Sequence, residues 1–270
     1  MNLKNIGGAC LAMILAASLC IGCGSGVANN EKEEPEIQGT LPQLSWSAEC
    51  FADKLFVVYG DSITYGARVS DKRSLYINRL SEKCGFRYKS FAVSGSTLAH
   101  GNDAQQKNGS GVQYVFENAD YNRQADYALI FYGANDFSHN VRLGSGEKVS
   151  GTYSSVSEYK DGMLYVYESL KSCNKDMGII FITPIYRADI PVNGLGLRMS
   201  AYDDAVREMC GKLGCYYVGL ENLFDADNFG EGSRYTPDKL HPNDEGHALI
   251  YTAMLERGIS IPEGYKSRNG

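Results

Sequence analysis

Hydrophobic residues are not spread evenly along the chain but gather in short apolar runs separated by polar and glycine-rich segments. Runs of this kind occupy residues 54–59, 86–93, 126–132, 178–183 and 215–218. A short apolar run bounded by turn residues is typical of a strand that is buried on both faces of a parallel sheet. We therefore predict five strands at these positions.

Between the runs, apolar residues recur at the three- and four-residue spacing of an amphipathic helix. Residues 73–84 have helical composition, and a last helix is expected over 245–257, capped by Asn243 or Asp244. The spacing is clearest in two sets: Val156, Tyr159, Met163, Tyr167 and Leu170, and Met199, Tyr202, Val206, Met209 and Leu213.

Strands that alternate with helices over residues 41–270 predict a single α/β domain, a three-layer α/β/α sandwich around a mostly parallel five-stranded sheet. In such sheets ligands bind beyond the carboxyl ends of the strands. Ser62, Gly95 and Asn135 follow the first three predicted strands there. The Gly-, Ser- and Asn-rich loops that follow the same strand ends are candidate rims of a pocket, at residues 99–112 and 137–154.

The first 40 residues have a different character. Residues 6–22 form an uncharged apolar stretch with the length of a signal-peptide core rather than of a membrane span. The stretch ends at Cys23 and resembles the cleavage box of bacterial lipoproteins, with Cys20 where leucine is usual. We expect a signal peptide at 1–22, lipidation of Cys23 and a flexible acidic tether at 23–40. Ordinary secretion is the alternative.

The charge of the chain narrows the range of partners. The formal net charge is −6, and no run of lysine and arginine occurs. Nucleic-acid binding usually needs a clustered basic face, so we expect no nucleic-acid partner. Contact with a membrane is expected only through the N-terminal lipid, which places the protein outside the cytoplasm in the cell envelope.

Eight cysteines are present, and three of them fall within the first 23 residues. The other five are odd in number and lack the spacing of a metal site. Most are expected to be buried thiols, although one disulfide of undetermined pairing is compatible with an oxidising compartment. These five are Cys50, Cys84, Cys173, Cys210 and Cys215.

A serine and a histidine at opposite ends of the domain suggest nucleophilic catalysis. Ser62 lies at a strand-to-helix turn, where a hydroxyl can be exposed, although a serine there is by itself more typical of a helix cap. Asp238 precedes His241 by three residues, close enough to hold one ring nitrogen while the other faces the nucleophile. A weak alcohol nucleophile needs such a base, and the base needs an orienting partner.

Acyl transfer also needs hydrogen-bond donors for the oxyanion. Gly95 lacks a Cβ and so allows a close backbone approach, and Asn135 offers a side-chain amide at the next strand end. Taken singly, these residues are equally typical of a turn glycine and an Asn-Asp turn.

Taken together, the segments around these residues resemble the SGNH hydrolase, or GDSL-like esterase, superfamily. They occur in the same order as in the family and span residues 55–247. The matching segments are GDSIT at 60–64, VSGS at 93–96, GAND at 133–136 and DKLHPN at 238–243. The resemblance implies a flavodoxin-like sheet without metal or organic cofactor. It also implies Ser62 as nucleophile, His241 as base and then acid, Asp238 as orienting residue, and an oxyanion hole of the Ser62 and Gly95 amides with the Asn135 side chain.

One residue departs from the family motif and bears on the substrate. Ile63 stands where the family name has leucine, and this variant resembles the branch that acts on acylated carbohydrates. We expect a serine esterase that forms an acyl-Ser62 intermediate and removes acetyl groups from a carbohydrate. A lipase or lysophospholipase of the same fold, a glycan-binding surface lipoprotein without activity, and an adhesion or structural lipoprotein are the alternatives. No Gly-x-Ser-x-Gly or zinc-protease motif occurs.

The remaining polar residues near these blocks have simpler interpretations. His247 is expected to pack or cap the last helix rather than to catalyse. Asp61, Asp136 and Asp244 are expected to secure turns or helix starts. Arg187 follows the fourth predicted strand, where it forms an ion pair or contacts an anionic or sugar group.

Overall fold

The chain divides into two units, Met1–Glu36 and Ile37–Gly270. The expected signal peptide, lipidated Cys23 and tether, all within residues 1–40, lie outside the described residues. In the part of the second unit that is described, no helix is long and apolar enough to cross a membrane. The computed structural model describes residues 41–101, 108–224 and 234–262.

Within these described ranges, five strands form one sheet, and every pair of neighbouring strands is parallel. The order across the sheet is β2-β1-β3-β4-β5, the doubly wound arrangement of flavodoxin-like folds. Each predicted strand is present, which confirms the sequence-based expectation. The bounds are β1 Leu55–Gly60, β2 Arg87–Ser90, β3 Tyr127–Phe131, β4 Gly178–Ile182 and β5 Tyr216–Val218.

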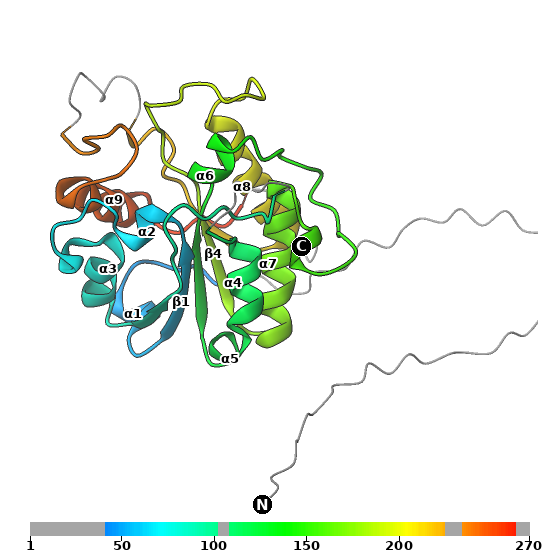
Figure 1. Ribbon diagram of the computed structural model, residues 1–270. Coiled ribbons are helices and arrows are strands. Elements are labelled where there is room, and N and C mark those ends of the chain that lie inside the picture. Colours follow the sequence, from blue (N-terminus) through cyan, green and yellow to red (C-terminus); the bar gives the residue numbers. More distant parts are fainter. Residues whose placement is uncertain (1–40, 102–107, 225–233, 263–270) are drawn as a thin grey trace, which may run out of the picture. The chain divides into compact units, whose positions relative to one another are not determined.

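Helices cover both faces of the sheet (Figure 1). Helices α1, α3 and α9 contact one another on one face, and α4, α5, α7 and α8 do so on the other. The helices are α1 Ala48–Phe51, α2 Ser62–Tyr65, α3 Tyr76–Cys84, α4 Gly111–Glu117, α5 Ala119–Asn122, α6 Ala134–Ser138, α7 Tyr159–Cys173, α8 Ser200–Leu213 and α9 Asp244–Arg257, with 3₁₀ turns at Lys72–Ser74 and Tyr153–Ser155.

Two hydrophobic cores arise because successive side chains of a strand point to opposite faces. In β1, Val57 and Tyr59 enter the core under α4, α7 and α8, whereas Phe56 and Val58 enter the core under α1, α3 and α9. β3 and β4 alternate in the same way. Both faces of the central strands are therefore apolar, which explains why these strands appear in the sequence as unbroken hydrophobic runs.

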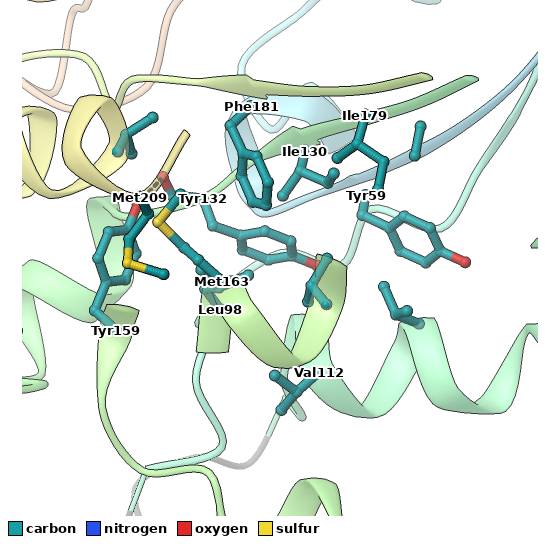
Figure 2. Close-up of a cluster of buried hydrophobic side chains, with 14 of the residues drawn as sticks. Tyr59, Leu98, Val112, Ile130, Tyr132, Tyr159, Met163, Ile179, Phe181 and Met209 are labelled. Carbon is teal, nitrogen blue, oxygen red and sulfur yellow. Dashed lines mark hydrogen bonds between the residues drawn. The ribbon is translucent and has the colours of Figure 1, made fainter. Parts of the chain in front are cut away.

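Figure 2 shows the first of these cores, in which side chains from the strands meet side chains from the helices. The strands contribute Tyr59, Ile130, Ile179 and Phe181, and the helices contribute Val112, Met163 and Met209. The packing fixes the central strands against their covering helices. The loops at the carboxyl edge of the sheet are thereby held on a rigid base.

The five cysteines of the domain are free thiols. Cys84, Cys210 and Cys215 are buried, in agreement with the expectation for most of them, and Cys50 and Cys173 are half-buried.

Candidate active site

Ser62 lies directly after the central strand β1, as the first residue of the single-turn helix α2. Asp61 caps this helix, since its carboxylate accepts a hydrogen bond of 2.9 Å from the Ile63 N–H. The turn closes at Gly66, whose N–H donates to the Ser62 carbonyl over 2.9 Å. The Ser62 side chain is thus held at the carboxyl edge of the sheet, and only 3% of the residue is exposed.

The structure brings together the three residues that the sequence proposed for nucleophilic catalysis. His241 Nε2 lies 2.9 Å from Ser62 Oγ, although the two residues are 179 positions apart in the sequence. On the other side of the ring, His241 Nδ1 lies 2.9 Å from Asp238 Oδ2. A serine, an imidazole and a carboxylate in this continuous hydrogen-bonded order form the arrangement that activates an alcohol for acyl transfer.

The backbone of the His241 loop orients Asp238. Lys239 has a φ of 64°, in the left-handed region, and its N–H donates to the Thr236 carbonyl over 2.8 Å. This turn folds the chain so that Asp238 Oδ1 accepts the N–H groups of His241 at 2.7 Å and Leu240 at 3.2 Å. One carboxylate oxygen is therefore occupied by the backbone, and the other is directed to the imidazole.

Asp238 has a second charged partner that the sequence analysis did not identify. Arg68 Nε donates to Asp238 Oδ2 over 2.9 Å. Partial burial raises the pKa of Asp238, but the donors from His241 and Arg68 outweigh it and hold that pKa well below its usual range. Asp238 is consequently an anion at neutral pH.

Gly95 and Asn135, two of the proposed oxyanion donors, come from the loop after β2 and from helix α6, which contact each other. Asn135 lies in α6, directly after β3, and its Nδ2 donates to the Ser96 carbonyl over 2.9 Å. Gly95 has a φ of 81°, and a Cβ there would lie 2.3 Å from Asn108 Nδ2. Only glycine fits this position without strain. The residue that follows it, Ser96, is the one whose carbonyl binds the Asn135 amide.

Asp136 does more than the expected turn or cap. Its side chain is fully buried and reaches the loop after β2, where it accepts the Leu98 N–H at 2.9 and 3.0 Å and the Ala99 N–H at 3.2 Å. The loop that carries Gly95 is thereby tied to α6, which carries Asn135. Burial raises the pKa of Asp136 to about 7, and burial likewise raises that of Asp61 to about 7.

Arg187 forms the ion pair that was one of its two expected roles, with the arginine side chain buried and its partner Asp189 partly exposed. Its Nε and Nη2 bind the two carboxylate oxygens of Asp189 at 2.9 and 2.6 Å. Its Nη1 donates to the Ala134 carbonyl over 2.6 Å, and the next residue, Ala188, donates its N–H to the Lys239 carbonyl. The segment after β4 therefore connects the start of α6 with the His241 loop.

His247 packs rather than catalyses, as the sequence analysis expected. The residue is fully buried, and its ring lies parallel to that of Tyr76, with centroids 6.0 Å apart. The Tyr76 hydroxyl lies 3.0 Å from Thr64 Oγ1 in α2. Helix α9 is thus coupled to the helix that carries Ser62. The cap of α9 is Asn243, whose side chain accepts the Gly246 N–H.

His247 is expected to make stability depend on pH. Burial lowers the pKa of His247 to about 4, against 6.5 in an unfolded chain. Between these values the unfolded chain binds a proton that the folded protein excludes. Stability therefore falls as pH drops from 6.5 towards 4, by about 3 kcal/mol. Urea denaturation of the wild type and His247→Phe across this range measures the effect.

The comparison of the two proteins isolates His247 from the other titrating groups. Phenylalanine keeps an aromatic ring against Tyr76 but binds no proton. The wild type is expected to lose more stability than the variant over this interval. Parallel stability curves for the two proteins would contradict the assignment.

In the described ranges, no group of three or more His, Cys, Asp and Glu side chains is placed to hold a metal ion. The groups that the structure brings together at the site are the Ser62 hydroxyl, the His241 imidazole and the Asp238 carboxylate.

Solved structures share this fold over most of the domain. A protein from Lactobacillus plantarum is 23% identical, with a TM-score of 0.60 over 76% of this chain and 96% of that chain. An acetylxylan esterase from Geobacillus stearothermophilus, solved as a catalytic mutant, is 16% identical, with a TM-score of 0.53 over 77% and 94% of the two chains. A hydrolase from the metagenome of Lake Arreo is 22% identical, with a TM-score of 0.51 over 77% and 95%.

A comparison with curated proteins found no match. The model of the GDSL-like lipase/acylhydrolase family, by contrast, matches residues 58–249, which hold all the residues of the site described above. The match covers well over half of the chain. The chain therefore belongs to the GDSL-like lipase/acylhydrolase family and is a carboxylic ester hydrolase.

Proposed function

We propose that the enzyme cleaves its ester through a covalent acyl-Ser62 intermediate. The observation that carries the proposal is the hydrogen-bonded chain from Ser62 Oγ through His241 to Asp238, with both links at 2.9 Å. His241 Nε2 accepts the serine proton as Oγ attacks the ester carbonyl. The Asp238 carboxylate holds the ring in the required tautomer and stabilises the imidazolium that forms.

We assign stabilisation of the negative charge on the carbonyl oxygen to the amide donors at the same edge of the sheet. These are the backbone N–H groups of Ser62 and Gly95 and the side chain of Asn135. Collapse of the tetrahedral intermediate expels the alcohol, which takes its proton from His241. Water then attacks the acyl-serine with the same histidine as base, and Ser62 leaves with the proton returned to it.

For the substrate, we propose a short acyl ester of a carbohydrate, cleaved outside the cytoplasm by a protein anchored through Cys23. The support for the substrate is Ile63 in the nucleophile block, together with the fold shared with an acetylxylan esterase. The support for the location is the leader-like segment 1–22. A lipase of the same fold is the competing function, because the family includes lipases and acylhydrolases alike.

Acyl-chain length separates these two functions. The enzyme is expected to hydrolyse p-nitrophenyl acetate with a kcat/KM at least about tenfold above that for p-nitrophenyl octanoate, because each extra methylene must fit the acyl pocket. Release of acetate from acetylated xylo-oligosaccharides, with Ser62→Ala as the blank, extends the test to a sugar. A preference for octanoate, with no acetate released from sugars, would favour the lipase.

A further inference from the structure

The loop between α2 and the first 3₁₀ turn contacts the segment that carries His241 at two points. The first is the ion pair of Arg68 Nε with Asp238 Oδ2, at 2.9 Å. At the second, Asp244 accepts the Ser70 N–H over 2.9 Å and also the Ser70 hydroxyl. The loop thus follows the nucleophile directly in the sequence and lies against the base in space.

Two donors share Asp238 Oδ2. Arg68 Nε and His241 Nδ1 both lie 2.9 Å from it, while Asp238 Oδ1 is occupied by backbone N–H groups. The Asp238 carboxylate therefore divides its charge between a permanent cation and a ring that is neutral when it acts as a base. The Arg68 side chain is 57% exposed, so it contributes little to the hydrophobic core.

We propose that Arg68 is a positioning residue that acts through Asp238 and sets the acid end of the enzyme's working pH range. The inference rests on the proposed function, in which neutral His241 removes the proton of Ser62. The guanidinium beside the ring disfavours a second positive charge on His241. By binding Asp238 Oδ2, the guanidinium also neutralises part of the carboxylate charge that would otherwise stabilise the imidazolium. Both effects oppose formation of the imidazolium.

The direction in which removal of Arg68 shifts the pH profile therefore follows. Without the guanidinium, His241 is protonated more readily, and the acid limb of the kcat/KM profile moves to higher pH. A unit charge about 6 Å away in surroundings close to water shifts a titration by about half a pH unit. Salt weakens the effect, because the Debye length falls from about 10 Å at 0.1 M to about 3 Å at 1 M.

The charged groups on the neighbouring elements are the same in the wild type and in the Arg68 variants. A difference between two variants at the same pH therefore reports on Arg68. These groups are Asp238 and Lys239 on the loop itself, Asp61 before α2, Lys72 in the first 3₁₀ turn, Asp244 and His247 in α9, and Arg187 with Asp189 after β4.

The test is the pH dependence of kcat/KM for p-nitrophenyl acetate from pH 4.5 to 8 at low ionic strength. Arg68→Met is expected to raise the midpoint of the acid limb by about half a pH unit. Arg68→Lys keeps the charge and is expected to restore most of the wild-type midpoint. In 1 M salt the difference between wild type and Arg68→Met is expected to shrink.

Ser70→Ala is the matched control, because it removes the hydroxyl bond from the same loop to Asp244 without changing any charge and keeps the backbone N–H bond. Its acid limb is expected to keep the wild-type midpoint. A reduced kcat in Arg68→Met with an unmoved midpoint, or an equal shift in Ser70→Ala, would overturn the proposal. Full activity of Ser62→Ala would instead refute the proposed function, so the two failures are distinguishable.

Discussion

Ser62→Ala is expected to lower kcat for p-nitrophenyl acetate by about 10⁴- to 10⁶-fold while leaving the fold and substrate binding nearly intact. Ser62 is 97% buried and its Oγ contacts His241, so removal of one oxygen deletes the nucleophile without opening a large cavity. The measurement is the rate of nitrophenol release by purified enzyme, with circular dichroism as the check on folding.

A double variant sharpens this prediction. If Ser62 and His241 act as one unit, then Ser62→Ala combined with His241→Gln is expected to lose no more activity than Ser62→Ala alone. Losses that simply multiply would mean that the two residues act independently. Such a result would contradict the hydrogen-bonded chain as the catalytic unit.

Asp238→Asn is expected to reduce kcat by about 10⁴-fold near neutral pH, a larger loss than one missing hydrogen bond would give. Asp238 Oδ1 accepts two backbone N–H groups, so the amide oxygen of asparagine takes that place. The amide NH₂ then faces His241 Nδ1, which must become the acceptor. His241 Nε2 carries the proton in that tautomer and cannot accept one from Ser62.

Because asparagine has nearly the same shape as aspartate, this variant separates tautomer control from packing. Asp238→Ala is the matched control: it leaves the ring without a partner and permits either tautomer. We expect Asp238→Asn to be at least as inactive as Asp238→Ala in kcat measurements at pH 7 to 8. Near-wild-type activity of Asp238→Asn would show that Asp238 does not orient the imidazole.

The strands of the sheet were predictable because strands that are buried on both faces produce continuous hydrophobic runs in the sequence. The strands β1, β3 and β4 are apolar on both faces, so each forms an unbroken hydrophobic run that ends where the chain reaches the carboxyl edge. Helices α7 and α8 cover one face with several turns, which is long enough for a helical period to appear. The flavodoxin-like strand order, by contrast, came from the family resemblance.

The short helices were not predictable by periodicity. α2 and α6 contain four and five residues, so a 3.6-residue period is completed little more than once. Their positions depend on tertiary contacts, such as the approach of Asn135 to the Ser96 carbonyl. Yet these two elements carry Ser62 and Asn135, and the sequence revealed both residues only through their chemistry and the surrounding motifs.

The residues that support the site could not be predicted from the sequence, for a related reason. Asp136 binds N–H groups 37 and 38 positions away, and Arg68 binds Asp238 across 170 positions. Contacts of this kind have no local spacing that a sequence pattern could reveal. The Asp238–His241 pair was visible because its members are three residues apart and joined by one turn.

The most direct test of the central claim is covalent labelling with a fluorophosphonate, which phosphonylates an activated serine with loss of fluoride. After digestion, mass spectrometry is expected to find the label on Ser62 in the wild type, with loss of esterase activity in proportion to labelling. Ser62→Ala is expected to remain unlabelled, and Asp238→Asn to react far more slowly. A label on another residue, or complete labelling of Ser62 with esterase activity intact, would contradict the assignment of Ser62 as the nucleophile.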